Sequence, residues 1–222
     1  MNQEEKSKRS REQILHAALD LFSRCGYRAT SVRDIAQAAR LSTGNVYHHF
    51  PDKESIFLAL LDEYWQAIDD PDLPFNRALA TDTFPENLED IARAARETIK
   101  RHRKHITLIY VDVVEFEGRH IQKFYSEMSA RFARFLARSG GDIQMKRRLR
   151  HGISPLSAVM LASRFLLQYF AVEIVFGVPD QFGKDTDEVI REFAEILRHG
   201  MLRPEVTRAS GGTLEAVAGA KR

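Results

Sequence analysis

The sequence predicts an all-α protein of about nine helices, with an N-terminal helix-turn-helix domain and a larger helical domain after it. Apolar residues recur at helical spacing along most of the chain, as at Ile14, Ala18 and Phe22. No stretch alternates convincingly between apolar and polar residues with a period of two, so no strand is predicted. With 222 residues, 44% of them hydrophobic, the chain can bury a sizeable core.

Composition and charge narrow the class of protein. The formal net charge is only +2, but residues 1–53 hold nine Lys and Arg against six Asp and Glu. The single Cys25 allows no internal disulfide and no thiolate cluster for a metal, which suits a reducing compartment. The N-terminus has no apolar signal segment, and no run of about 18 apolar residues follows. We therefore expect a cytoplasmic protein without a membrane partner.

The first two helices are predicted from their ends. Ser10 with Gln13 fits a capping box, and Gly26 stands where that helix should stop. Ser31, three residues before Asp34, begins a second helix. The buried side of this second helix is expected to consist of small and branched apolar residues, namely Ile35, Ala36 and Ala39.

Two further helix starts follow closely. Ser42 is a third cap and begins a short helix over residues 43–49, with Val46 and Phe50 as its inward anchors. Asp52 caps a fourth helix that continues to Trp65. The apolar face of the fourth helix consists of Ile56, Phe57, Leu60, Leu61 and Tyr64.

The rest of the chain begins with a turn-rich linker with two prolines, at residues 69–76. Helical patterns then cover residues 86–104, 106–117, 119–137, 154–176 and 185–202. Residues 139–155 are predicted as a loop with a basic run, and the tail from Arg203 as mobile. The predicted domains are 1–53 (N-terminal arm and helix-turn-helix), 54–65 (connecting helix), 66–203 (effector binding and dimerisation) and 204–222 (tail).

The short third helix has the side chains that a recognition helix needs in the major groove of DNA. Thr43 and Gly44 are small enough for a close approach to base edges, and Thr43 and Asn45 can read them directly. The Tyr47 hydroxyl can donate to phosphate. Three nitrogen-bearing side chains at the outer end can also hold the backbone, namely His48, His49 and Lys53.

The stretch TSVRDIAQAARLSTGNVYHHFPDKESIF, residues 30–57, resembles the DNA-binding signature of the TetR (tetracycline-repressor) family of bacterial transcriptional regulators. The match is dense over about residues 10–62. The resemblance implies that Ser31 caps the second helix and touches a phosphate, and that Arg33 reaches a base edge or the backbone. It also implies groove contacts by Thr43, Gly44, Asn45 and Tyr47, and backbone contacts by His48, His49 and Lys53.

One position departs from the family pattern. The turn between the two short helices often carries glycine in the family, and this chain has Arg40 there. If the turn requires a positive φ, arginine costs about 1 kcal/mol. Residues 6–11, KSKRSR, form either a basic arm near the DNA or a disordered solubilising tail.

The C-terminal helices suggest a dimer. The pattern over residues 154–176 is apolar nearly all round, so this helix must be buried on two sides. The resemblance implies that it pairs, with the last helix, in a four-helix homodimer interface; the alternative is an ordinary monomer core. It also implies a small-molecule pocket in residues 66–203 whose occupation releases the protein from a palindromic operator. An apolar or aromatic effector would fit aromatic candidates there, namely Tyr110, Phe116, Phe165 and Tyr169.

Two spacings could indicate metal chemistry. Glu117 and His120 have the spacing of di-iron bundles, which need a second copy that this sequence lacks. His102 and His105 fit a solvated helix end better than a ligand pair. We therefore predict a ligand-responsive repressor, with no cofactor, metal or enzymatic activity. The alternatives are a helical-bundle metal protein or enzyme with an incidental helix-turn-helix, and a DNA-binding regulator that senses a protein partner.

Overall fold

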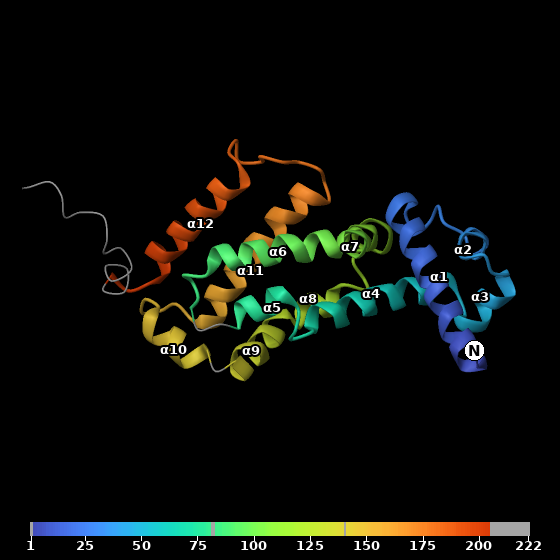
Figure 1. Cartoon of the computed structure of the whole chain (residues 1–222), viewed down its shortest axis with the longest axis horizontal. Coiled ribbons are helices and arrows are strands. Elements are labelled where there is room, and N and C mark those ends of the chain that lie inside the picture. The colour runs from blue at the N-terminus through green and yellow to red at the C-terminus, as the bar shows by residue number, and fades with distance from the viewer. Residues whose placement is uncertain (1, 81–82, 140, 205–222) are drawn as a thin grey trace, which may run out of the picture. The chain divides into compact units, whose positions relative to one another are not determined.

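The computed structural model describes residues 2–80, 83–139 and 141–204 (Figure 1). Over these residues, the only β pairing is an isolated bridge between Leu149 and Leu202, which confirms the all-α prediction. The described helices are α1 (Gln3–Cys25), α2 (Val32–Ala39), α3 (Thr43–His49), α4 (Lys53–Asp69), α5 (Pro74–Leu79), α6 (Leu88–Arg101), α7 (Arg103–Phe116), α8 (Gln122–Ser126), α9 (Met128–Ser139), α10 (Gly141–Arg148), α11 (Pro155–Ile174) and α12 (Thr186–Met201).

Helix α1 begins earlier than predicted. The Asn2 side chain accepts the Glu5 N–H at 2.7 Å, and the Glu5 carboxylate accepts the Asn2 N–H at 2.9 Å, which completes a capping box. Ser10 therefore lies inside the helix and does not cap it. Residues 6–11 are helical, so they form neither a flexible arm nor a disordered tail. Their Lys, Arg and Glu side chains favour helix, which lets the first turn extend without a break.

The other predicted caps are confirmed. Ser31 and Asp34 form a capping box at the start of α2, with the Asp34 N–H 3.1 Å from the Ser31 hydroxyl oxygen. Asp52 does the same with Ser55 at the start of α4. The remaining caps are Ser42 for α3, Ser154 for α11 and Asp185 for α12.

The middle of the chain is more divided than predicted. The prolines of residues 69–76 do not exclude helix, because Pro74 is the first residue of α5 and needs no N–H partner there. The pattern over 119–137 forms α8 and α9 in place of one helix. The predicted basic loop contains α10. The predicted mobile tail falls, after residue 204, outside the described part of the chain.

The chain folds as two compact units. The first contains the described residues up to Leu73 together with Ile99–Met128, and the second contains Pro74–Thr98 and the described residues from Ser129 on. In the first unit, α7 contributes the fully buried Leu108 to the core formed by α1 to α4. The DNA-binding head, defined as α1, α2, α3 and the first turn of α4, thus shares its core with a helix from much later in the chain.

Helix α11 lies in the second unit and is its most apolar helix by sequence. It is long and apolar enough to cross a membrane, with a mean hydropathy of 1.3 over an 18-residue window, but half of that window is buried inside the protein. The central residues of its buried face are Ala158, Val159, Ala162, Leu166, Tyr169 and Phe170. This burial is that of a core helix.

Candidate nucleic-acid interface

The core of the DNA-binding head fixes which side of α3 faces outward. Val46 is fully buried and Phe50, the residue that ends α3, is 4% exposed. Both pack with Ile35 of α2 and Ile14 of α1 in one apolar cluster. The two predicted anchors of α3 are therefore confirmed as buried, and the opposite side of the helix is left to solvent.

The turn between α2 and α3 depends on a strained residue. Arg40 ends α2 in the left-handed region, at φ 56° and ψ 41°. Its N–H donates to the Gln37 carbonyl at 3.1 Å, and the Leu41 N–H donates to the Ala36 carbonyl at 2.9 Å. These bonds close the end of α2. The positive φ at this turn, which the sequence could only suggest, is present and is occupied by a residue with a Cβ.

Three of the predicted DNA-contacting residues lie open on α3. Thr43 and Gly44 are exposed, and Tyr47 has 55% of its surface exposed. A Cβ at Gly44 would meet nothing closer than the Ser42 hydroxyl at 3.9 Å, so the fold does not require glycine at this position. A residue that weakens a short helix without serving its packing indicates that something else must approach closely.

The remaining residues of α3 are less open. Asn45 is half-buried, and its Oδ1 atom is buried with no hydrogen-bond partner. His48 is exposed, and its ring lies edge-on to that of His49, 5.2 Å away. Burial lowers the pKa of His49, and the neighbouring His48 and Arg11 lower it further. His49 is therefore neutral at pH 7 and offers one ring N–H.

Lys53 is used inside the protein. Its ammonium donates to the carbonyl oxygens of Tyr27 at 2.8 Å and Thr30 at 2.7 Å, and it lies 4.0 Å from the centre of the Tyr27 ring. Burial lowers its pKa. The loop between α1 and α2 thus engages two of the three ammonium hydrogens, and a phosphate contact by Lys53 would use the third.

The start of α2 contributes the other two predicted contacts. Both Ser31 and Arg33 are exposed. The Ser31 hydroxyl donates to the Asp34 carboxylate at 2.6 Å, and hydrogen bonds from Ser31 lower the pKa of Asp34. In this arrangement the hydroxyl proton of Ser31 is committed to its cap, so a phosphate would have to compete with Asp34 for it.

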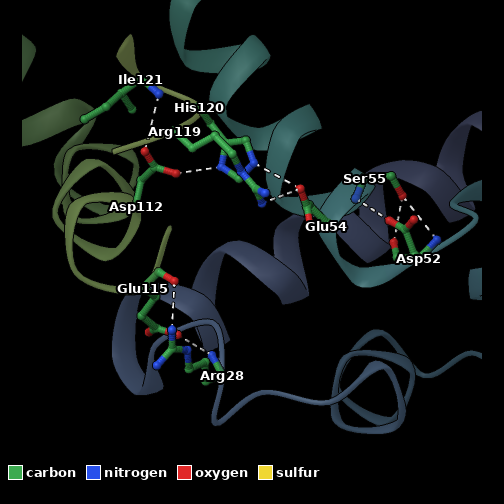
Figure 2. A network of polar contacts seen from close by, with 9 residues as sticks. All are labelled: Arg28, Asp52, Glu54, Ser55, Asp112, Glu115, Arg119, His120 and Ile121. Carbon is green, nitrogen blue, oxygen red and sulfur yellow. Dashed lines mark hydrogen bonds and ion pairs between the residues drawn. The ribbon is translucent and has the colours of Figure 1, made fainter. Parts of the chain in front are cut away.

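Two contributions to the interface were not predicted. The Glu115 carboxylate of α7 accepts the Tyr27 N–H at 2.9 Å and the Arg28 N–H at 2.6 Å (Figure 2). No local pattern could reveal this bond, because it joins residues almost ninety positions apart. The Arg11 guanidinium lies over the Phe50 ring, 5.2 Å from its centre. Its place one turn before Ile14 and Leu15 was the only signal of this contact.

The four predicted effector contacts fall in different units. Phe116 packs against Tyr27 at 4.5 Å and Phe57 at 5.1 Å, and thereby supports the head. Tyr110 belongs to the same unit. In the second unit, Phe165 stacks on Phe193 at 3.8 Å, and Tyr169, 3% exposed, lies 5.9 Å from Phe165.

The two spacings considered for metal binding have other surroundings. Glu117 ends α7 in the left-handed region at φ 57°. His120 contacts the carboxylates of Asp112 and Glu54. Over the described ranges, no group of three or more His, Cys, Asp or Glu side chains is arranged to hold a metal ion.

Comparison with known proteins places residues 14–60 in the family described as "Bacterial regulatory proteins, tetR family". The chain is 35% identical over 103 residues to the HTH-type transcriptional repressor KstR2 of Mycolicibacterium smegmatis, covering 46% of this chain and 48% of that protein. It is 34% identical over 102 residues to the uncharacterised HTH-type regulator YuxN of Bacillus subtilis, covering 46% and 30%. The chain thus spans half or less of the length of these relatives.

Likeness to solved structures extends over most of the chain. The crystal structure of NalD from Pseudomonas aeruginosa, a repressor of a multidrug efflux pump, matches with a TM-score of 0.60 over 89% of this chain and 99% of that one. The identity is 24%, so this likeness supports the fold.

Proposed function

Because the chain belongs to the TetR family of bacterial regulatory proteins, we propose that it is a transcriptional repressor that binds a palindromic operator as a homodimer. The observation that carries this proposal is the open face of α3. Thr43, Gly44 and Tyr47 are exposed there while Val46 and Phe50 hold the helix from behind. A helix held in this way can enter the major groove without disturbing the core.

The exposed side chains divide into two kinds of contact. Thr43 reads base edges at the N-terminal end of α3, where Gly44 permits close approach, and Asn45 adds to this readout once its amide turns outward. Tyr47, His48 and His49 hold phosphates. Further phosphate contacts are proposed for Ser31, Arg33 and the free hydrogen of Lys53.

The homodimer is proposed from the second unit. Leu161 of α11 is 57% exposed and Ile196 of α12 is 67% exposed, and both would be covered in a helical interface between two copies. Two reading heads held about 34–36 Å apart can bind successive major grooves on one side of a duplex. The dimer therefore gives a short helix the contacts of two half-sites.

The release signal is proposed to be a small, largely apolar or aromatic effector. Phe165, Tyr169 and Phe193 gather aromatic surface between α11 and α12. Tyr110 and Phe116 are candidates in the first unit. A change in α7 on binding would reach the head directly, because Glu115 of α7 holds the loop after α1. We propose a binding function without catalysis, and a cytoplasmic location, since the apolar α11 is half buried within the protein.

The direct test is selection of duplex DNA from a random pool by the purified protein, followed by binding measurements on the selected sequence. A palindromic site is expected. Changing Thr43 to Ala should alter the selected sequence at one position of each half-site, by about 1–3 kcal/mol. Tyr47→Ala should weaken binding to all sequences alike. Failure to enrich any sequence, or unchanged affinity in both variants, would refute the assignment.

A further inference from the structure

Helix α7 is joined to the DNA-binding head by two polar links (Figure 2). The first is the Glu115 carboxylate on the backbone N–H groups of Tyr27 and Arg28. Backbone donors do not titrate, so this link is independent of pH while Glu115 is ionised. The second link runs through the imidazole of His120, which can carry one or two protons.

The His120 ring lies between carboxylates from two helices. Its Nδ1 atom is 2.6 Å from Asp112 Oδ1 of α7, and its Nε2 atom is 3.1 Å from Glu54 Oε1 of α4. The ring is 8% exposed and Asp112 is fully buried. Asp112 also accepts the Ile121 N–H at 3.3 Å, which fixes the carboxylate from its other side.

Counting donors gives the protonation state that this arrangement needs. An ionised carboxylate can only accept, so each ring nitrogen of His120 must donate. A neutral imidazole has one N–H, and the short contact to the buried Asp112 would keep it at Nδ1. The lone pair of Nε2 would then face the Glu54 oxygen, and that contact would be lost.

The other groups around His120 do not replace this bond. Phe116 of α7 and Phe57 of α4 pack on the ring and carry no charge. Arg119 also pairs with Glu54 Oε1, at 2.9 Å, but its side chain is 62% exposed. Such an exposed ion pair is screened by solvent and contributes little. Tyr27, the nearest titratable group of the loop after α1, is kept neutral because burial raises its pKa.

We propose that His120 is a positioning residue for the DNA-binding head, and that its second proton fastens the first turn of α4 to α7. Glu54 follows Phe50, the residue that ends the recognition helix, by only four positions. Losing the proton as the pH rises therefore releases the support behind α3. The link between α4 and α7 stands by itself, whereas its effect on DNA rests on the proposed function.

The test measures the thermal midpoint of the full chain, without DNA, between about pH 5.5 and 8.5, on both sides of the ordinary histidine range. The folded protein holds a proton that the unfolded chain releases, so stability should fall as the pH rises. His120→Gln should remove this component. Glu54→Gln should remove it too, because the amide can donate to a neutral ring. The control is His16→Gln, an exposed histidine on α1 of the same unit.

Profiles that match the wild type in both Gln variants would overturn the proposal, as would equal flattening in His16→Gln. If His120→Gln does not fold, Glu54→Gln decides together with the ¹⁵N shifts of the wild-type ring, which should show two protonated nitrogens at the acid end. The selected duplex then separates the two proposals. Affinity that falls from pH 6 to 8 in the wild type but not in Glu54→Gln supports both. A flat protein profile with intact DNA binding refutes the His120 link alone, and the reverse result refutes the DNA-binding function alone.

Discussion

The ammonium of Lys53 lies 2.7 Å from the carbonyl oxygen of Thr30, a residue that is 3% exposed. The same ammonium satisfies the Tyr27 carbonyl. Lys53 therefore joins the start of α4 to the loop between α1 and α2, whatever it does on DNA. Its contribution to folding and its contribution to DNA binding can be measured apart.

The first prediction concerns this lysine. Lys53→Met keeps the aliphatic stem but removes the donor, so two carbonyl groups lose their partner. We expect the free energy of unfolding to fall by about 1–3 kcal/mol in urea titrations. Lys146→Met, on the exposed surface of α10, should change it by less than about 0.5 kcal/mol. Equal stability of the two variants would show that the carbonyl contacts contribute nothing.

The second prediction separates packing from approach at Gly44. Because a Cβ there has open space, Gly44→Ala should keep the fold and stabilise α3 by up to about 1 kcal/mol. In the same sample, affinity for the selected duplex should drop at least tenfold, since the added methyl holds the helix away from the bases. Calorimetry and a binding titration measure the two effects. Unchanged affinity would show that α3 does not approach DNA at this residue.

The third prediction uses the strained turn. Arg40→Gly should raise the free energy of unfolding by about 1 kcal/mol, because glycine adopts the left-handed conformation without penalty. Arg40→Ala is the matched control: it loses the same charge but keeps the Cβ, so it should bring no gain. If both variants gained equally, charge and not backbone strain would be the cause.

The fourth prediction concerns the helical N-terminus. Lys6 and Arg9 are exposed on α1, and Arg11, one turn from Lys8, lies over Phe50 beside the recognition helix. If Lys6 and Arg9 contact phosphates, replacing both by Ala should reduce the slope of log affinity against log salt by about 0.9 for each lost contact. The pair Lys146→Ala and Arg147→Ala removes the same charge from α10 and should leave the slope unchanged.

The fifth prediction tests the dimer. Ile196→Glu should place a charge in the proposed interface of α12 and yield monomers in sedimentation experiments, with loss of operator binding. Ile143 of α10 has nearly the same exposure, 66% against 67%, and serves as the control. Monomers from Ile143→Glu, or dimers from Ile196→Glu, would place the interface elsewhere.

Local signals allowed most of the head to be predicted. Ser31, Ser42 and Asp52 each bond an N–H three residues on, so their positions alone fix where helices start. Ser10 had the same signal and was wrong, because an equally good cap at Asn2 stands earlier on an unbroken helical stretch. Competition between two valid caps is decided by the residues between them, which here all tolerate helix.

Tertiary bonds account for what the sequence could not predict. The pattern over 119–137 gave no reason for a late start, yet the Ile121 N–H is held by the Asp112 side chain and α8 begins after it. Asp112 itself reads as one polar residue in an apolar stretch. Lys53 fitted a phosphate ligand by position, and only the folded chain shows that two carbonyl groups share its ammonium.

The bond from Glu115 to the loop after α1 also bears on protein engineering. Swapping reading specificity between relatives by exchanging only the first seventy residues would separate donors from their acceptor, and Leu108 from the core it completes. A chimaera that carries Ile99–Met128 along with the head keeps both intact. The natural unit of exchange is therefore discontinuous in the gene.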